Sequence, residues 1–303
     1  MSAIKEERQR REQFIAEFRY PLEMDVISSN IGHSVKPINV HPFNYLHTDK
    51  RYCRHGDTSS IIILVKSTAH NFARRQAIRE TWGKDASQYR IGVVFMLGFI
   101  KEIQYLIDEE SAVHQDIVQE DFEDSYRNNT YKTIMMFNWT ATYCKTQTIA
   151  FFIDDDQYIN IRKLTNFLES TEIDKNKLLT GTATSFGQPY RDKSSKWYVS
   201  RDEYPFDYWP PYLAGGAILA SISVVKNMTS LFPYVKYLSI DDVYLGIVAK
   251  KLGIELIHNT LMSNRGKRIK LLPLLIANHG YAEPRDFYSA NAYLSKHIDD
   301  IYS

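Results

Sequence analysis

The 303-residue sequence has few cysteines and no long apolar run, and both shortages limit what the protein can be. Its two cysteines, Cys53 and Cys144, lack metal-ligand spacing and can form at most one disulfide, so they assign no cellular compartment. No stretch approaches the roughly 20 apolar residues of a membrane span. Residues 1–19 are charged throughout and lack the apolar core of a signal peptide.

An excess of charge of either sign is also missing. The 37 Lys and Arg residues balance 36 Asp and Glu residues, which leaves a net charge of +1. Because a nucleic-acid binder needs clustered positive charge, we expect no nucleic-acid partner. Apolar residues make up 44% of the chain, enough for a sizeable core without disulfide cross-links.

Short apolar runs alternate with helix-like segments in the greater part of the chain. The predicted strands are 61–65, 91–97, 149–153 and 178–182, and the predicted helices include 102–113, 132–143 and 161–168. This alternation predicts an α/β domain with a mostly parallel central sheet. We expect that domain to span residues 58–303, after an irregular leader over residues 1–57 with a polar helix near 3–18.

Three consecutive carboxylates, Asp154, Asp155 and Asp156, follow the predicted strand 149–153 directly. In open α/β sheets, ligands bind beyond the carboxyl ends of the strands. Adjacent carboxylates repel one another unless a divalent cation neutralises them, and such a cation completes its shell with substrate phosphates and water. Taken alone, a solvated acidic turn explains the run equally well.

Other segments allow both a chemical and a structural interpretation. Asp241 and Asp242 open a helix-like segment, where a carboxylate either caps the helix or acts as a general base. The basic segment 74–79 suits a diphosphate or a solvated helix face. The segment 209–216 (WPPYLAGG) is a stiff turn with adjacent glycines, and His279 is either a metal ligand or an ordinary core residue.

Taken in order, six segments resemble the β-1,3-glycosyltransferases of glycosyltransferase family 31, which include galactosyltransferases and N-acetylglucosaminyltransferases. The matching segments are RRQAIRETWG (74–83), DIVQEDFEDSYRNNTYKT (116–133), FIDDDQYIN (152–160), KWYVSRDEYP (196–205), WPPYLAGGAILAS (209–221) and DDVYLGIVAKKLGI (241–254). Each segment alone is only suggestive, but six in the same order make a chance match very improbable.

The resemblance implies a GT-A fold, a single Rossmann-like α/β domain that binds a UDP-sugar and a divalent cation, usually Mn²⁺. It implies an inverting hexosyltransferase that makes a β-1,3 linkage, with galactose favoured over an N-acetylhexosamine. The acceptor would be a glycan, glycolipid or glycoprotein. The alternatives are a catalytically silent relative that acts as a glycan-binding or chaperone-like partner, and a phosphatase-type hydrolase.

The family also implies the Golgi lumen and a membrane anchor, which this sequence does not contain. Three N-x-[ST] sequons, at Asn128, Asn138 and Asn227, agree with the secretory pathway. Such sequons are frequent by chance, so the compartment follows mainly from the resemblance.

Roles for single residues also follow from the resemblance. Asp242 matches the family's general base, and Asp156 and His279 match its metal ligands. Trp197 and Tyr212 fall on the acceptor side. The predicted donor-binding residues are Arg75, Arg79, Lys132, Asp154, Asp155, Gly215 and Gly216.

The sequence departs from the family pattern at three places. Asp241 replaces a glutamate before the base, and Leu213 and Ala217 replace a cysteine and a glycine. Because position 213 offers no disulfide partner and Cys53 lies in the predicted leader, we expect Cys53 and Cys144 to remain free thiols. Ala217 is expected to narrow the acceptor side.

The two adjacent carboxylates are expected to have different roles. Asp242 lies at a helix start, where the helix dipole favours the ionised form that a base needs. Its neighbour Asp241 is expected to cap the helix or to hold the geometry of the site.

Overall fold

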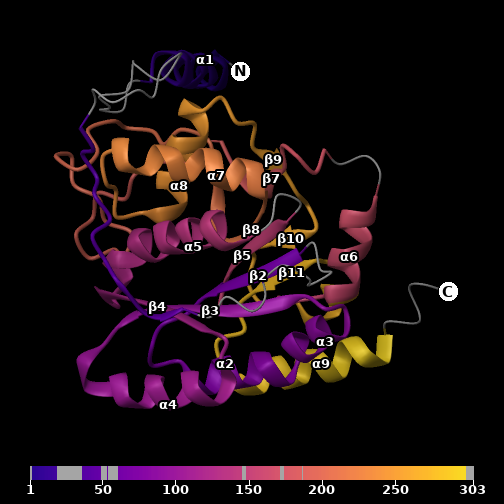
Figure 1. Ribbon diagram of the computed structural model, residues 1–303. Helices are drawn as coiled ribbons and strands as arrows, with labels where there is room; N and C mark the ends of the chain where they lie inside the picture. The colour runs from indigo at the N-terminus through magenta and orange to yellow at the C-terminus, as the bar shows by residue number, and fades with distance from the viewer. Residues whose placement is uncertain are drawn as a thin grey trace.

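The chain forms a central β-sheet between two layers of helices (Figure 1). The computed structural model describes residues 2–18, 36–48, 53, 61–144, 148–170, 174–185 and 187–297. In the predicted leader, residues 1, 19–35, 49–52 and 54–57 therefore lie outside the described residues. No helix in these ranges is long and apolar enough to cross a lipid bilayer.

Eight strands in these ranges form the main sheet in the order β1-β4-β3-β2-β5-β8-β7-β9. Neighbours among β4, β3, β2 and β5 run parallel, whereas β8 is antiparallel to both β5 and β7. The strands of this sheet are β1 (Tyr45–Thr48), β2 (Ile61–Lys66), β3 (Gly92–Phe99), β4 (Ile117–Glu123), β5 (Ile149–Asp154), β7 (Leu179–Thr184), β8 (Tyr212–Ser221) and β9 (Ile257–His258). The predicted α/β fold with a mostly parallel central sheet is confirmed.

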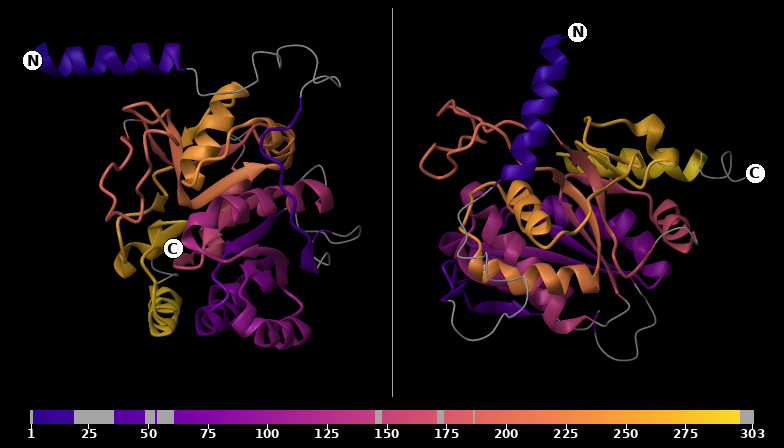
Figure 2. Two further views of the ribbon diagram at one scale, coloured as in Figure 1. Left: turned by 90° about the vertical axis from the view of Figure 1, so that its left-hand side faces the viewer. Right: turned by 90° about the horizontal axis from the view of Figure 1, so that it is seen from above.

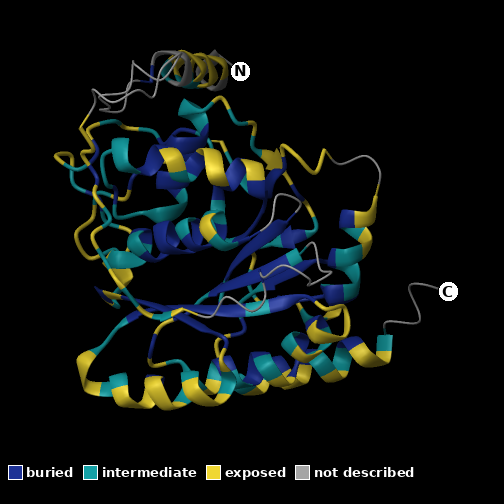
Figure 3. Cartoon of the chain, viewed as in Figure 1, coloured by how far each residue is buried: buried dark blue, intermediate teal, exposed yellow. Residues whose placement is uncertain are grey.

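Helices cover both faces of the sheet, with α5, α7 and α8 on one face and α2, α3, α4 and α9 on the other (Figure 1). The α-helices are α1 (Ser2–Glu17), α2 (Phe72–Glu80), α3 (Trp82–Gln88), α4 (Gln104–His114), α5 (Asn129–Tyr143), α6 (Ile161–Glu169), α7 (Ile222–Leu231), α8 (Asp241–Lys251) and α9 (Pro284–His297). Short 3-10 helices are η2 (Lys101–Ile103), η3 (Tyr126–Asn128), η4 (Phe232–Tyr234) and η5 (Ile269–Leu274). The sheet itself is buried, while the outer side of α4 is exposed (Figure 3).

The polar helix predicted near residues 3–18 is confirmed as α1, which projects away from the sheet layers (Figure 2). It contacts the rest of the molecule through Phe14 and Phe18, whose rings pack against Phe206 at centroid distances of 5.8 and 5.3 Å. Tyr208 adds a hydrogen bond to Glu7 at 3.0 Å. Because Phe206 and Tyr208 lie in the loop before β8, helix α1 supports that loop.

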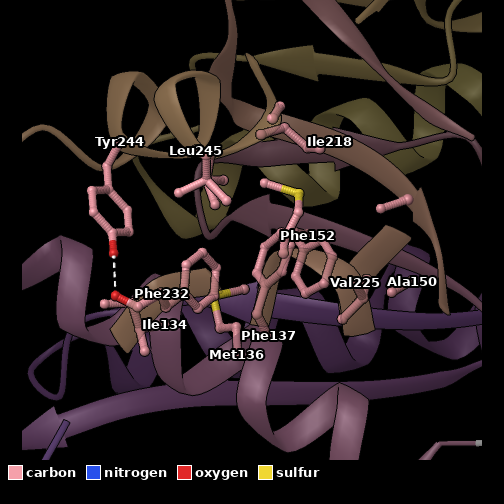
Figure 4. Close-up of a cluster of buried hydrophobic side chains, with 14 of the residues drawn as sticks. Ile134, Met136, Phe137, Ala150, Phe152, Ile218, Val225, Phe232, Tyr244 and Leu245 are labelled. Atoms are coloured by element: carbon pink, nitrogen blue, oxygen red, sulfur yellow. Dashed lines mark hydrogen bonds between the residues drawn. The ribbon is translucent and has the colours of Figure 1, made fainter. Parts of the chain in front are cut away.

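Aromatic packing fixes α5 and α8 over the sheet (Figure 4). Phe137 of α5 stacks on Phe152 of β5 with ring centroids 4.3 Å apart and 9° between the ring planes. The hydroxyl of Tyr244 in α8 donates to the carbonyl of Phe232 at 3.2 Å. Buried aromatic side chains of this kind dominate core energetics, so the start of α8 has a defined position above the strand ends.

The strand register places polar side chains together at the carboxyl ends of β2 and β5. Lys66, the last residue of β2, pairs in register with Asp154, the last residue of β5. The chain then enters a small second sheet, β10-β11-β6, whose strands are β10 (Met262–Ser263), β11 (Ala277–His279) and β6 (Gln157–Ile159). There His279 pairs with Gln157, so His279 lies next to Asp156.

Part of the predicted leader belongs to the main sheet. Strand β1 pairs antiparallel with β4, with Tyr45 opposite Glu120. A domain that starts at residue 58 therefore omits a strand of its own sheet.

The expectation that Cys53 and Cys144 remain free thiols is wrong. They form a disulfide with a Cα–Cα distance of 4.6 Å across 91 residues of sequence. Loss of a cysteine at position 213 removes one partner for Cys144 but does not exclude another. Strand β1, which precedes Cys53 in the chain, is part of the sheet edge, and the disulfide joins Cys53 to the end of α5. The irregular sequence around Cys53 did not indicate this proximity.

This disulfide predicts a measurable loss of stability on reduction. Cross-linking residues so far apart in sequence restricts the unfolded chain, and we expect reduction to lower the free energy of unfolding by about 2–4 kcal/mol. Urea unfolding with and without reductant measures the difference, and the double variant Cys53→Ser/Cys144→Ser should not respond to reductant. Two titratable thiols in the native, unreduced protein would contradict the assignment.

Candidate active site

A cavity of about 370 Å³ opens at the carboxyl ends of β2 and β5. The structure brings most of the sequence-predicted site residues to it. Those in its wall are Lys132, Asp154, Asp155, Asp156, Trp197, Gly215, Gly216, Asp242 and His279. Arg75, Arg79 and Tyr212 lie outside the wall.

The ammonium group of Lys66 links two carboxylates in this cavity. Its Nζ lies 3.0 Å from Oδ1 of Asp154 and 2.5 Å from Oδ2 of Asp241. Although burial by itself lowers the pKa of Lys66, the charges of Asp154 and Asp241 raise it above its ordinary value. The sequence analysis did not identify Lys66, but its position at the end of an apolar run next to the Asp-rich strand was the available signal.

Asp241 is a partner of Lys66 and does not cap the helix. The N-cap residue of α8 is Ile240, and no side chain caps that end. Besides Lys66, the hydroxyl of Thr133 donates to Oδ2 of Asp241 at 2.8 Å. Burial opposes ionisation of Asp241, but the charge and hydrogen bond of Lys66 lower its pKa. The capping role is therefore wrong, and the contacts agree with the alternative of holding the geometry of the site.

Asp242 lies next in sequence but in a different environment. Its Oδ1 accepts from the backbone N–H of Val243 at 2.8 Å, and Oδ2 accepts from that of Gly215 at 3.3 Å. Burial and the neighbouring charge of Asp241 raise the pKa of Asp242 to about 7. These effects outweigh that of the helix dipole. Asp242 is therefore only partly ionised at neutral pH, contrary to the expectation that the dipole favours its ionised form. A carboxylate with this pKa is suited to proton transfer near neutrality.

Asp156 and His279 form a pair on another part of the wall. Nε2 of His279 lies 2.9 Å from Oδ2 of Asp156, and this hydrogen bond raises the pKa of His279. Among the described residues, Oδ1 of Asp156 and Nδ1 of His279 are buried without a hydrogen-bond partner. Unsatisfied buried polar atoms are costly, and a carboxylate oxygen with an imidazole nitrogen forms a donor set that suits Mn²⁺ or a similar cation.

This donor set is small. In the part of the chain that the structure describes, no group of three or more His, Cys, Asp or Glu side chains is arranged around one metal position. A cation held by Asp156 and His279 would therefore take its other ligands from substrate phosphates and water.

Asp155 has its oxygens occupied by neighbouring side chains. Ser67 and Asn71 donate to Oδ2 at 2.6 and 2.7 Å, and Arg74 donates to Oδ1 at 2.5 Å. These bonds hold the segment before α2 against the end of β5. Its predicted donor-binding role stays a prediction.

The two arginines predicted to bind the donor do not line the cavity. Arg75 is fully buried, and its guanidinium lies 2.5 Å from Glu110 of α4. Arg79 lies 2.8 Å from Asp116 and 2.7 Å from Glu110. Helix α2 directs this face toward Glu110 and Asp116, whose carboxylates pair with both guanidinium groups. The donor-binding role of the two arginines stays a prediction.

Lys132 reaches the wall but is already paired. Its Nζ donates to Oδ1 of Asp124 at 2.7 Å and to the carbonyl of Ser67 at 2.6 Å. Burial lowers the pKa of Lys132 despite the charge of Asp124. Its contacts are those of a structural ion pair.

The glycines of β8 allow a close approach to the cavity. A Cβ atom on Gly216 would lie 2.5 Å from Nε2 of Gln157, and one on Gly215 would lie 3.3 Å from Cβ of Asp242. Tyr212, at the start of the strand, is half-buried and lies outside the wall. Ala217 is buried within β8 and does not line the cavity, so the expected narrowing is not seen.

The sequence of this chain is similar to that of known proteins. The family model described as galactosyltransferase matches residues 73–260. The chain is 38% identical over 201 residues to β-1,3-galactosyltransferase brn of Drosophila melanogaster, a match that covers 65% of this chain and 62% of that protein. It is 34% identical to human β-1,3-galactosyltransferase 1, covering 74% and 70%. It is 30% identical to lactosylceramide 1,3-N-acetyl-β-D-glucosaminyltransferase A of Xenopus laevis, covering 81% and 69%.

Removal of the Lys66 ammonium is expected to destabilise the fold. Lys66→Met leaves the buried carboxylates of Asp154 and Asp241 without their cation, and we expect a loss of about 3–5 kcal/mol in the free energy of unfolding at pH 7.5. The double variant Lys66→Met/Asp241→Asn removes one of these charges and should lose less than the single variant. Urea unfolding measures the free energy of unfolding of the two single variants, Lys66→Met and Asp241→Asn, and of the double variant. If the loss in the double variant equals the sum of the two single losses, Lys66 and Asp241 are not coupled.

Proposed function

We propose that this chain, which belongs to the galactosyltransferase family, transfers a hexose from a UDP-sugar to a glycan hydroxyl with inversion, in a β-1,3 linkage. Galactose is the first candidate, because the fruit-fly and human relatives are named galactosyltransferases. An N-acetylhexosamine is the second, because the Xenopus relative is named an N-acetylglucosaminyltransferase. The acceptor class is a glycan, alone or on a lipid or protein.

One observation carries the proposal. Asp242, whose pKa is raised to about 7, lines the same cavity as the Asp156–His279 pair with its unsatisfied atoms. An inverting transfer needs one base for the acceptor hydroxyl and a positively charged group at the departing diphosphate. The cavity contains residues for both tasks.

Asp242 is the general base in this mechanism. The acceptor hydroxyl oxygen attacks the anomeric carbon as the bond to UDP breaks, and the hydroxyl proton passes to the carboxylate of Asp242. The backbone N–H groups of Gly215 and Val243 hold that carboxylate in place. Attack is direct, so no enzyme nucleophile is required. A positioned base of suitable pKa contributes typically about 10²–10⁴-fold to the rate.

Asp156 and His279 are the residues that would hold the cation. When bound, Mn²⁺ or a similar ion would supply Lewis-acid stabilisation of the charge that develops on the diphosphate. Lys66 holds Asp154 close beside this position by its ion pair at 3.0 Å. The carboxylates at the strand end therefore keep a fixed arrangement before substrate binds.

We further propose that the protein works in the Golgi lumen. Disulfides persist in oxidising compartments, and the Cys53–Cys144 bond supports such a location. The sequon residue Asn227 is exposed on α7, where it is accessible to modification. The silent-relative alternative is not favoured, because Asp242, Asp156 and His279 are all present in the cavity.

Substitution of the base tests the mechanism. In Asp242→Asn the side chain keeps its size but cannot take the proton, so we expect kcat to fall by at least about 100-fold. UDP binding, measured by calorimetry with Mn²⁺, should change little. Wild-type turnover in this variant would exclude Asp242 as the base.

The pH dependence follows from the same group. Only ionised Asp242 accepts a proton, so kcat/KM should rise by about tenfold between pH 6 and pH 8, with a midpoint near 7. Residual activity of Asp242→Asn should lack this rise. A flat profile for the wild-type enzyme over this range, with binding intact, would contradict the assignment.

Metal dependence can be measured without turnover. We expect UDP to bind the wild-type protein more tightly with Mn²⁺ than with a chelator, and Asp156→Ala to lose that difference because a ligand is removed. Asp192→Ala, at an exposed position in the loop before β8, is the matched control and should behave as wild type. Full wild-type turnover in chelator would overturn the metal assignment.

A further inference from the structure

Three exposed aromatic side chains lie in and beside the cavity that contains the candidate base, Asp242. Tyr126 and Trp197 line the cavity, whereas Tyr190 lies outside it. Their exposed fractions are 44%, 43% and 54%, respectively. Large aromatic groups exposed together on a surface commonly mark an interaction site. We call Tyr126, Trp197 and Tyr190 the aromatic platform.

The members of the platform follow one another from the candidate base to the protein surface. Tyr126 lines the same cavity as Asp242, and burial together with the charges of Asp241 and Asp242 raises the pKa of its phenol to about 12. Trp197 lines the same cavity as Tyr126. Beyond it, the Trp197 ring packs on Tyr190 with centroids 5.2 Å apart and 39° between the planes.

Lys196 joins two members of the platform. Its ammonium lies 4.7 Å from the ring centroid of Trp197 and 5.5 Å from that of Tyr126. Because Lys196 also lines the cavity, the platform combines flat apolar faces with a donor for hydroxyl groups. Carbohydrates have both apolar C–H faces and hydroxyl groups, so this combination suits a sugar.

The loop that carries Tyr190 and Trp197 is held by hydrogen bonds from the side chain of Arg191 to main-chain carbonyls. Arg191 donates to the carbonyls of Val199 and Ser200 from one nitrogen and to those of Tyr204 and Phe206 from the other, at 2.7–2.9 Å. The backbone N–H of Val199 also donates to the carbonyl of Tyr190 at 3.0 Å. Tyr190 and Trp197 are therefore placed before any ligand binds, which lowers the entropy cost of binding.

We propose that the acceptor is an oligosaccharide, and that Tyr190 binds the second sugar from its reacting end. This inference rests on the proposed function. The donor sugar and the terminal acceptor sugar share the cavity, so the rest of the acceptor leaves past Trp197. The next surface along that path is the ring of Tyr190. Tyr190 is thus a specificity-determining residue that favours disaccharide acceptors over monosaccharides.

The test compares acceptors that differ only by the second sugar. Methyl β-galactoside is paired with lactose, and methyl β-N-acetylglucosaminide is paired with a disaccharide that ends in the same sugar. We expect wild-type kcat/KM to favour the disaccharide, mainly through KM, and Tyr190→Ala to reduce that preference by roughly tenfold, equivalent to about 1.4 kcal/mol of lost contact.

Two control variants separate this role from general damage. Tyr190→Phe keeps the ring and should retain the preference. Tyr105→Ala removes an exposed tyrosine, 62% exposed on α4, from the opposite helix layer and should leave it unchanged. If Tyr190→Ala lowers kcat/KM equally for both acceptors, or changes only a glycoprotein acceptor, the platform does not bind the second sugar and the proposal is overturned.

A binding measurement distinguishes failure of this inference from failure of the proposed function. Saturation-transfer NMR with UDP and Mn²⁺ reports binding of the disaccharide and monosaccharide without turnover. If no UDP-sugar is turned over but Tyr190→Ala still weakens disaccharide binding selectively, the proposed activity fails and the sugar site remains. If both acceptors bind alike in wild type and variant, the sugar site is excluded.

Discussion

The ion pairs of Lys66 are the interaction on which the candidate site depends. Lys66 ends β2, Asp154 ends the neighbouring strand β5, and Asp241 begins α8, so a single ammonium connects three elements. Without that charge, the carboxylates would repel one another in a buried space. Removing one partner of such a buried arrangement is costly, because the remaining charge has lost both water and its counter-ion.

This arrangement also separates the roles of two adjacent carboxylates. Asp241 takes the contact with Lys66 and therefore stays ionised. Asp242 is buried beside that negative charge, and these two effects raise its pKa although the backbone N–H groups of Val243 and Gly215 lower it. Groups whose environments move their pKa values apart commonly have different chemical roles. Here the pKa difference arises between two residues adjacent in sequence. Asp241 contacts the ammonium group of Lys66, whereas Asp242 contacts the backbone of β8.

The sequence was sufficient for the elements whose signal is local. Continuous apolar runs identified the parallel strands. The rule that ligands bind at the carboxyl ends of strands identified the carboxylates after residue 153 as candidate site residues. The partners of Arg75 and Arg79 were not predictable, because helix periodicity does not reveal that Glu110 of α4 lies opposite. The disulfide was missed for the same reason, since its cysteines are 91 residues apart.

The way Arg191 holds the loop before β8 has a consequence for how such a protein can diverge. Among the residues that the structure describes, its guanidinium donates only to main-chain carbonyls, which every amino acid provides. Most side chains along the loop can therefore change between descendants of a common ancestor without loss of the loop's shape. New substrate preferences can therefore arise by single replacements on an unchanged loop, whereas replacement of Arg191 would remove the hydrogen bonds that hold it.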